Sequence, residues 1–600
     1  MSKKPTFSLS VLAVCLFSSV FTTASAVDSN SLNAESKAAL AEQRLGFGKK
    51  SMVVTNNPWS SQAAQDILAK GGSATDAAIA AAFVLGLTEP QSSGIGGGGY
   101  AVSYHDKKLI AYDGREVAPH SATPAWFLTE SGQPLDFRTA WLSSRSVGVP
   151  GEIAMFYKMH QQSGKLKWAE LLQPAIKLAK NGFPMSKILH KELLEEQDVL
   201  VNNPAVVKVY FNADKTIKPI GQMIKNPAYA ETLAQVAKTP DNFYSGKIAK
   251  DIVKVVNDHA QQKLFALKDL SNYRALSSNA LCSDYRGGYQ LCSVPPSSAG
   301  GVTSQELVKL FANKYKSTDV TDSKWVYTFL EASKLAYADR NQYLADPKFV
   351  KQPVDGLLDT GYLSQRSELI TESALATPVA AGVPAGIDTR YAPDVSPKPH
   401  GTTSISVVDK NGNAVSMTVT VENTFGSHLF VDGFFLNNEL TDFSFESVTA
   451  SGKPIANRVE AGKRPRSSIS PTIVLDKNKQ LYAVAGSPGG SFIICTVARN
   501  LILMLDFKLN PYEAAAYPNF CAINNDPIVE SGDSAVSVMV PQLESYGELI
   551  QRKDVFSGEA NIIRDGSGWA GGADPRREGI ALGENDKLHT SVSWTPVAGQ

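Results

Sequence analysis

Residues 402–422 consist of two strand-like runs separated by a turn signal. They read TTSISVVD (402–409), KNG (410–412) and NAVSMTVTVE (413–422). In both runs polar and apolar residues alternate with period two, which is typical of half-buried β-strands. An Asn-Gly pair between two such runs is a strong hairpin signal. The stretch therefore predicts a β-hairpin that begins at its first threonine.

The loop length decides which residues of the hairpin face each other. A two-residue loop would pair Ser406 with Met417 and so mix polar and apolar side chains. A three-residue loop, with Gly412 in the left-handed position of a bulged turn, separates the two faces. Its apolar pairs are Val407–Val415, Ile405–Met417 and Thr403–Val419. Its polar pairs are Ser406–Ser416, Ser404–Thr418 and Thr402–Thr420. We prefer this register, which places Thr402 beside Thr420 at the open end of a polar face.

A polar strand face is usually just the solvated one, but the sequence around this hairpin favours a functional role. Three segments follow it within one hundred residues and supply carboxylates, hydroxyls and glycine-flanked amides. They are LNNELTDF (436–443), RPRSSISP (464–471) and GSPGGS (486–491). Before the hairpin, residues 370–400 are proline-spaced and poorly periodic, which predicts an exposed loop. A chain can be cut where such a loop meets a strand without losing its fold.

Five motifs, in order along the chain, resemble those of the γ-glutamyltransferases. They are DGREVAP (113–119), TTSISVVD (402–409), NNELTDFS (437–444), RPRSS (464–468) and GSPGGS (486–491), with further similarity at 71–99 and 295–301. The resemblance runs from about residue 48 to near Gly583. It implies an N-terminal-nucleophile hydrolase, an α+β protein with a four-layer αββα fold. It also implies that the precursor cuts itself before Thr402 into a large subunit, 27–401, and a small catalytic subunit, 402–600.

The resemblance assigns the reacting groups to four residues. Thr402 would be the nucleophile, and the α-amino group freed by cleavage would be its base. Thr420 would orient the Thr402 hydroxyl by hydrogen bonding. Gly489 and Gly490 look like the oxyanion hole, because glycines let backbone N–H groups approach a substrate closely. An acyl-enzyme would then pass the γ-glutamyl group to water or to the amine of an amino acid or peptide.

The same resemblance predicts how a glutamyl group would be held. Arg115 would pair with its α-carboxylate in a planar, bidentate way, and Ser467 and Ser468 would add hydrogen bonds. Asp442, with Glu439, would accept from its α-ammonium. Without the family context, Arg115 could be a surface ion pair with a neighbouring carboxylate, and Asp442 an ordinary turn residue.

One position departs from the family pattern. Glu422 stands where many members have asparagine, two residues after Thr420 and on the same strand face. Its carboxylate can still accept from an ammonium, but it adds negative charge near the donor carboxylate. The departure therefore bears on donor preference and not on the nucleophile.

Composition indicates a soluble globular chain with a small-molecule partner. Of 600 residues, 43% are hydrophobic and 19% charged, and 58 basic residues balance 58 acidic ones. This balance gives no reason to expect nucleic acid or an anionic surface as a partner. The eight histidines form no H-E-x-x-H pair and there is no C-x-x-C, so we expect neither a catalytic metal nor a cofactor.

The first 26 residues are typical of an export signal. A basic start is followed by an apolar stretch, 7–21, and then by the small-residue cleavage pattern Ala24-Ser25-Ala26. A membrane anchor is disfavoured because about 20 strongly apolar residues are needed to span a bilayer. A lipoprotein site at Cys15 is disfavoured by the large Val14 before it. We therefore expect an exported protein, periplasmic or secreted, without a membrane anchor after signal cleavage.

Cysteines and helices complete the expectations. Cys282 and Cys292 flank a turn-like segment and could form a disulfide or remain buried thiols. Three helices are expected to form the core, and their ends are marked by capping residues. They are Ala77–Leu87, capped by Ser73 or Thr75; Trp168–Lys180; and Lys324–Leu344, capped by Asp322 or Ser323.

Three other functions are rivals of the γ-glutamyltransferase prediction. GIGGGG (94–99) formally matches a dinucleotide-binding motif, but a helix precedes it and a strand follows, so tight packing explains its glycines better. A β-lactam side-chain acylase of the same superfamily shares the nucleophile but need not bind an α-ammonium. If the protein were instead an exported binding protein without catalysis, its chain would remain uncleaved.

Overall fold

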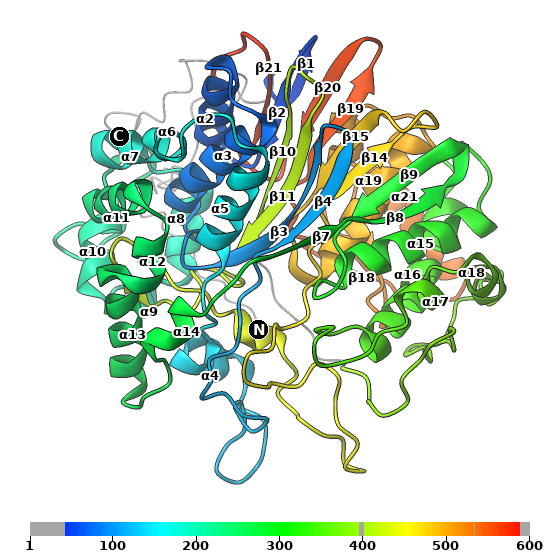
Figure 1. Ribbon diagram of the computed structural model, residues 1–600. Helices are drawn as coiled ribbons and strands as arrows, with labels where there is room; N and C mark the ends of the chain where they lie inside the picture. The colour runs from blue at the N-terminus through cyan, green and yellow to red at the C-terminus, as the bar shows by residue number, and fades with distance from the viewer. Residues whose placement is uncertain (1–41, 395–400, 533, 589–600) are drawn as a thin grey trace, which may run out of the picture.

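Two seven-stranded sheets stacked face to face form the centre of the molecule (Figure 1). The computed structural model describes residues 42–394, 401–532 and 534–588, so the expected export signal lies outside the described residues. Sheet 1 has the order β21 (Ile580–Gly583), β2 (Met52–Thr55), β10 (Thr403–Val408), β11 (Ala414–Thr420), β3 (Gly98–His105), β4 (Lys108–Asp113) and β7 (Leu276–Asn279). Sheet 2 has the order β1 (Leu45–Gly48), β20 (Gly568–Ala573), β19 (Ala560–Asp565), β15 (Leu481–Gly486), β14 (Thr472–Leu475), β9 (Tyr289–Ser293) and β8 (Leu281–Tyr285).

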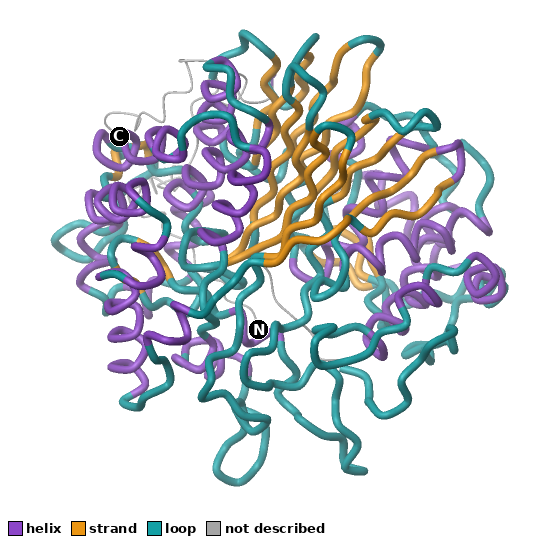
Figure 2. Tube along the Cα trace, in the orientation of Figure 1, coloured by secondary structure: helices purple, strands orange, loops and turns teal. Residues whose placement is uncertain are grey.

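Helices cover the outer face of each sheet, so the layers run helix, sheet, sheet, helix (Figure 2). Those on the side of sheet 1 are α2 (Pro58–Ala69), α3 (Ala74–Thr88), α4 (Phe137–Leu142), α5 (Glu152–Ser163), α6 (Trp168–Leu171), α7 (Gln173–Asn181), α8 (Lys187–Glu195), α9 (Gln197–Leu200), α10 (Pro204–Tyr210), α11 (Pro227–Lys238), α12 (Asp241–Ser245), α13 (Lys247–Ala260) and α14 (Leu267–Ser271). Those on the side of sheet 2 are α15 (Gly300–Lys314), α16 (Lys324–Tyr343), α17 (Val354–Leu357), α18 (Thr360–Ser367), α19 (Ile493–Leu505), α20 (Pro511–Ala516) and α21 (Ser534–Ser545). The predicted αββα arrangement of the α+β class is confirmed.

Short strands form three small additional sheets. They pair β5 (Phe183–Pro184) with β6 (Met223–Ile224), β12 (Phe430–Val431) with β13 (Phe434–Phe435), and β16 (Phe520–Cys521) with β17 (Ile528–Glu530) and β18 (Gln551–Lys553). In the parts of the chain that the structure describes, no helix is long and apolar enough to cross a lipid bilayer.

The predicted hairpin is present as β10 and β11 in the preferred register. Thr403 faces Val419, Ile405 faces Met417 and Val407 faces Val415. Gly412 has a φ of 78°, as the bulged three-residue turn requires. The register prediction is therefore confirmed.

The prediction that these strands are half-buried is wrong, because every residue of both is buried. The apolar face packs against α3, and the polar face packs against sheet 2 instead of water. Ser406 Oγ donates to the carbonyl of Ala560 at 2.7 Å, and Ser416 Oγ donates to that of Ala485 at 2.8 Å. The polar face here provides hydrogen bonds between the two sheets. The alternation of polar and apolar residues in a strand does not show whether its polar face contacts another sheet or water.

Each of the two seven-stranded sheets combines strands from before and after residue 402. In sheet 1, β10 lies between β2 and β11, and β21 lies at the other edge of β2. In sheet 2, β9 pairs with β14, and β1 pairs with β20. Neither the part of the chain before residue 402 nor the part after it contains all the strands of either seven-stranded sheet.

Two of the three expected helices form as predicted. In α3 the side chain of Ser73 accepts from the N–H of Asp76, and Asp76 bonds back to the N–H of Ser73, which settles the choice of cap. In α16 the carboxylate of Asp322 accepts from the N–H of Lys324, while Ser323 makes no side-chain cap bond. The expected single helix 168–180 is two helices, α6 and α7, and Pro174 lies in the first turn of α7.

The glycines of residues 94–99 permit close packing, as expected. Gly98 begins β3, and a Cβ on Gly97 would lie 1.9 Å from the carbonyl oxygen of Thr420. No side chain larger than hydrogen fits there, beside the end of the hairpin.

Residues 371–394 contain no helix or strand and are mostly exposed or half-buried, as the proline spacing predicted. The rest of that expected loop, residues 395–400, lies outside the described residues.

Two disulfides are present. Cys282–Cys292 joins directly opposed residues of β8 and β9, with Cα atoms 4.1 Å apart, so the bridge and not the pair of thiols is correct. Cys495–Cys521 joins α19 to β16 across 26 residues. The sequence contains no turn signal that predicted this second bridge.

Candidate functional site

Every predicted site residue except Gly489 lines one pocket at the end of the β10–β11 hairpin. The empty space of this pocket, counted with its open mouth, is about 340 Å³. Its lining consists of Arg115, Gly401, Thr402, Thr420, Glu422, Glu439, Asp442, Ser467, Ser468, Ile469, Gly490, Ser491 and Ile493. In the described part of the chain, no group of three or more His, Cys, Asp or Glu side chains is arranged to hold a metal ion.

The two threonines at the end of the hairpin are hydrogen-bonded to each other. Thr402 Oγ1 donates to Thr420 Oγ1 at 3.2 Å, and Thr420 Oγ1 donates to the carbonyl of Gly401 at 3.5 Å. The N–H of Glu422 donates to Thr420 Oγ1 at 2.8 Å, which fixes that hydroxyl. One hydroxyl therefore contacts both the predicted nucleophile and the carbonyl of the bond expected to be cut.

The backbone around residue 402 is strained and tightly packed. Thr402 has a φ of 152°, in a region that a β-branched residue rarely adopts. A Cβ on Gly401 would lie 2.1 Å from the carbonyl oxygen of Glu422, so only glycine fits before Thr402. The strain is located at the Gly401–Thr402 junction.

Arg577 and Glu89 support this junction, and sequence reasoning missed both. Arg577 Nη2 donates to the carbonyl of Thr402 at 3.1 Å, and its Nη1 lies 3.5 Å from a carboxylate oxygen of Glu89. Thr403 Oγ1 donates to Glu89 at 3.3 Å. Burial raises the pKa of Glu89 to about 7 although Arg577 opposes the shift. Both residues lie far from residue 402 in the sequence and carry no local motif that points to it.

The glycine pair that resembles an oxyanion hole forms a turn before α19. Gly489 has a φ of 132° and Gly490 a φ of 58°, so both need the conformational freedom of glycine. Gly490 begins the short helix η4 (Gly490–Phe492) and lines the pocket. Gly489 lies behind it, where a Cβ would be 2.9 Å from the carbonyl oxygen of Phe556. Within the described residues, neither glycine N–H donates a hydrogen bond to another protein atom.

Arg115 lines the pocket and is 1% exposed. Its guanidinium makes ion pairs with Glu439 and with Asp442, the latter at 2.5 Å. The alternative of a surface ion pair is wrong, since only its backbone N–H contacts Asp113, at 2.8 Å. The group predicted to bind a carboxylate is thus in direct contact with the two predicted to bind an ammonium.

The protonation of the acidic residues here is unusual. Burial raises the pKa of Glu439 to about 7 against the opposing effect of Arg115. Burial and the nearby Glu439 raise the pKa of Glu116 well above its usual range. Because the shift of Glu439 places its titration near neutrality, the charge of the pocket changes with pH in that range.

The two serines are held by backbone and by a buried arginine. Ser467 Oγ accepts from the N–H of Ile469 at 3.1 Å, and Ser468 Oγ accepts from Arg340 Nη2 at 2.7 Å. Burial and the neighbouring Arg466 lower the pKa of Arg340 to about 9. Arg340 was not predicted, although its position in the mostly apolar helix α16 was a usable signal.

Glu422 lines the pocket, but it does not lie on the strand face where it was expected. Strand β11 ends at Thr420, and Glu422 has a φ of 80°, so it lies in a turn and not on the strand face. Its carboxylate accepts from Asn438 Nδ2 at 2.5 Å. The turn nevertheless places a third carboxylate in the pocket with Glu439 and Asp442.

Sequence comparisons place this geometry in a known family. The γ-glutamyltranspeptidase family model matches residues 60–584. The chain is 32% identical over 560 residues to the glutathione hydrolase proenzyme of Bacillus subtilis (strain 168), covering 91% of this chain and 93% of that protein. It is 34% identical over 541 residues to the glutathione hydrolase proenzyme of Escherichia coli (strain K12), covering 88% and 90%.

Solved structures agree with the sequence comparisons. The cephalosporin acylase from Bacillus halodurans is similar with a TM-score of 0.79 and 27% identity, over 90% of this chain and 96% of that chain. The γ-glutamyltranspeptidase of Helicobacter pylori is similar with a TM-score of 0.51 and 31% identity, over 52% of this chain and 90% of that chain. The chain therefore belongs to the γ-glutamyltranspeptidase family, and with it to the N-terminal-nucleophile hydrolase superfamily.

Proposed function

We propose that the chain is the precursor of an exported γ-glutamyltransferase that acts on glutathione-like amides. The observation that carries this proposal is one pocket in which Thr402 lies with an arginine and three carboxylates. A glutamyl group has an α-carboxylate and an α-ammonium on one carbon, and the pocket offers both opposite charges. Relatives that are named glutathione hydrolase proenzymes support the same substrate class.

The first proposed reaction is self-cleavage before Thr402. Thr402 Oγ attacks the carbonyl carbon of Gly401, the hydroxyl proton passes to the departing amide nitrogen, and water then hydrolyses the resulting ester. The strained φ of Thr402 and the contact between Thr420 Oγ1 and the Gly401 carbonyl support this step. The products are a large subunit, 27–401 after removal of signal 1–26, and a small subunit, 402–600.

The second proposed reaction is transfer of the γ-glutamyl group. The freed α-amino group of Thr402 takes the hydroxyl proton as Oγ attacks the γ-amide carbon, and the amine of the donor leaves with a proton. N–H groups of Gly489 and Gly490 stabilise the oxyanion. Losing one such donor typically costs about 2.7–4 kcal/mol of transition-state stabilisation. Water or a second amine then releases the acyl group from the nucleophile.

The substrate is held by charge in this proposal. Arg115 binds the α-carboxylate together with Ser467 and Ser468, and Asp442 and Glu439 bind the α-ammonium. The ion pairs between Arg115 and the two carboxylates keep these groups in position before the substrate arrives, which lowers the cost of ordering them. Glu422 adds a further acceptor on the ammonium side and so favours donors with a free α-amino group.

A related acylase activity is the second candidate, because the cephalosporin acylase from Bacillus halodurans has a similar structure over nearly the whole chain. The two candidates differ in what the pocket must bind. A glutaryl amide has the carboxylate of a glutamyl amide but lacks its α-ammonium, so it offers the pocket carboxylates no cationic group to bind.

The test combines intact mass with two substrates. Wild-type protein should give two chains, the smaller beginning at Thr402, whereas Thr402→Ala should remain uncut. A γ-glutamyl anilide should be hydrolysed well and the matching glutaryl anilide poorly. A stable full-length wild-type mass would contradict self-cleavage, and a preference for the glutaryl amide would favour the acylase.

A further inference from the structure

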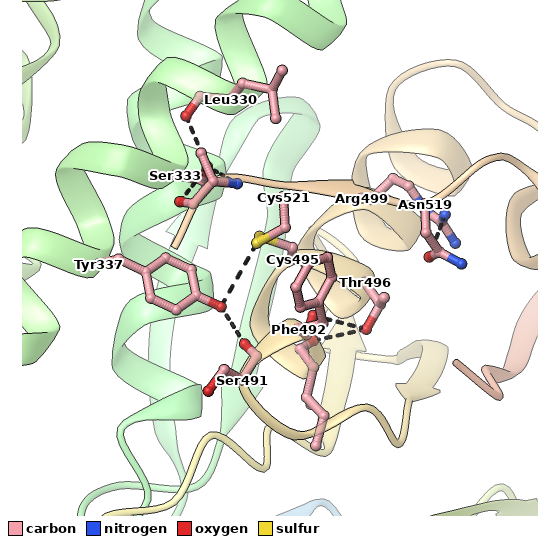
Figure 3. Close-up of a disulfide and its surroundings, with 12 residues drawn as sticks. Leu330, Ser333, Tyr337, Ser491, Phe492, Cys495, Thr496, Arg499, Asn519 and Cys521 are labelled. Atoms are coloured by element: carbon pink, nitrogen blue, oxygen red, sulfur yellow. Dashed lines mark hydrogen bonds between the residues drawn. A yellow bond between two sulfur atoms is a disulfide. The ribbon is translucent and has the colours of Figure 1, made fainter. Parts of the chain in front are cut away.

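The glycine turn of the pocket is held from behind by helix α16. Ser491 follows Gly490 directly and lines the pocket. The hydroxyl of Tyr337, a residue of α16 that is 1% exposed, donates to the carbonyl of Ser491 (Figure 3). Tyr337 therefore fixes the peptide group that follows Ser491, at the end of the glycine turn.

The Cys495–Cys521 disulfide lies at that point. Cys495 is in the first turn of α19, two residues after the helix begins, and Cys521 is in β16. The Sγ atom of Cys521 lies 3.9 Å from the hydroxyl oxygen of Tyr337 (Figure 3). Both cysteines are fully buried. The bridge thus joins the helix that carries the glycine turn to the strand that contacts Tyr337.

Strand β16 is in turn bound to α16, which closes a ring of contacts. Ser333 Oγ donates to the carbonyl of Ala522 at 3.0 Å and accepts from the N–H of Ala522 at 3.2 Å. Ser333 and Tyr337 are one helical turn apart on α16. The ring runs from Ser491 through α19, the disulfide, β16 and α16, and returns to Ser491 through Tyr337.

Another link between α19 and this segment does not use the cysteines. Arg499, one turn after Cys495, donates to Asn519 Oδ1 at 2.7 Å and to the carbonyls of Tyr517 and Pro518 at 2.8 Å. Without the disulfide, these bonds still hold α19 near β16, so we expect the fold to survive its removal. What the disulfide adds is a fixed position for the first turn of α19.

We propose that the Cys495–Cys521 disulfide is a positioning element for the oxyanion turn. It holds the first turn of α19 against Tyr337, and the bond from Tyr337 to Ser491 then directs the N–H of Gly490 into the pocket. The catalytic effect rests on the proposed function, because that function assigns the Gly490 N–H to the oxyanion. The cysteines and Tyr337 act through Gly490 and do not touch substrate.

The chain offers a matched control in its other disulfide. Cys282–Cys292 joins β8 and β9 at the edge of sheet 2, and neither cysteine lines the pocket that contains Thr402. Cys282→Ala/Cys292→Ala therefore removes a bond of the same kind, one disulfide, but leaves the ring of contacts around Cys495–Cys521 unchanged. Tyr337→Phe keeps the disulfide and the ring packing but removes the hydroxyl, so it tests the proposal if the cysteine variant folds poorly.

The first readout is kinetic. For a γ-glutamyl anilide, Cys495→Ala/Cys521→Ala and Tyr337→Phe should lower kcat about tenfold with KM nearly unchanged. Complete loss of one oxyanion-hole N–H donor lowers kcat about 10²–10³-fold, and a donor that is only misoriented should have a smaller effect. A γ-boronate analogue of glutamate, which becomes tetrahedral on Thr402, should lose affinity by a similar factor. The control variant should match wild type in both measurements. Unchanged kcat in both test variants of an active enzyme would overturn the proposal.

The second readout is independent of substrate. Hydrogen exchange of the peptide covering residues 487–497 should be faster in Cys495→Ala/Cys521→Ala and in Tyr337→Phe, but not in the control. Wild-type exchange in both test variants would overturn the proposal whichever substrate the enzyme uses. If wild type fails to cleave any γ-glutamyl donor, the proposed function fails, and the exchange comparison still decides whether the disulfide holds the turn.

Discussion

Thr420→Val should slow self-cleavage because it removes the hydroxyl that touches both reacting groups. Thr420 Oγ1 lies 3.5 Å from the Gly401 carbonyl oxygen, which becomes negative when Thr402 attacks. Removal of one donor to such an oxygen costs about 2.7–4 kcal/mol, or a 10²–10³-fold slower reaction. Because the contact is long before reaction, we expect the lower end, about 10²-fold. Valine has nearly the same shape, so packing is retained.

The substitution has a separate cost to stability. The N–H of Glu422 donates to the same hydroxyl at 2.8 Å and would lose its buried acceptor. An unsatisfied buried donor costs about 1–3 kcal/mol of the free energy of unfolding. A chemical denaturation curve measures this loss, which is distinct from the cleavage rate.

The assay follows freshly purified precursor by intact mass and fits the appearance of the chain that begins at Thr402. Thr420→Ser keeps the hydroxyl and should restore most of the rate. Thr418→Val is the matched control, since Thr418 lies on the same strand face, is fully buried, and its Oγ1 has no hydrogen-bond partner among the described residues. Cleavage of Thr420→Val at the rate of Thr418→Val would refute the reasoning.

Two further predictions concern the pocket, and a third concerns the close packing beside the hairpin. With the pKa of Glu439 at about 7, KM for a γ-glutamyl donor should fall as pH rises through neutrality, because the ionised carboxylate attracts the α-ammonium; Glu439→Gln should flatten this pH profile in steady-state kinetics. Arg115→Lys cannot reach both Glu439 and Asp442 with planar geometry and should raise KM by about 10- to 100-fold, the equivalent of one lost charged hydrogen bond. Gly97→Ala places a Cβ 1.9 Å from a carbonyl oxygen of β11, and should lower the free energy of unfolding by about 1–3 kcal/mol in a denaturant titration.

The parts of the fold that depend on local sequence were predictable. The register of β10 and β11 followed from the alternation of residues 402–422 and the position of Gly412, because loop length and face sorting are local properties. The site residues came from short motifs, and the structure brings all but Gly489 to one pocket.

The parts that depend on distant contacts were not predictable. Arg577 reaches the carbonyl of Thr402 from 175 residues away, and nothing near either residue signals the contact. The bridge from Cys495 to Cys521 joins a helix to a strand without a turn between them. Glu422 was placed on a strand face because the alternation continued in the sequence, whereas its φ of 80° shows that the strand had already ended.

Because each large sheet contains strands from both sides of residue 402, cleavage affects how the molecule can refold. The precursor folds as one chain, so β10 meets β2 and β11 at the high local concentration that a single polymer provides. A cleaved enzyme that unfolds must instead reassemble two separate polymers, neither of which contains all the strands of either seven-stranded sheet. Recovery then depends on encounter between them and slows with dilution. After cleavage, heat inactivation would thus be irreversible at low protein concentration. The half-life of the enzyme at a given temperature would then be set by its unfolding rate and not by the equilibrium free energy of unfolding.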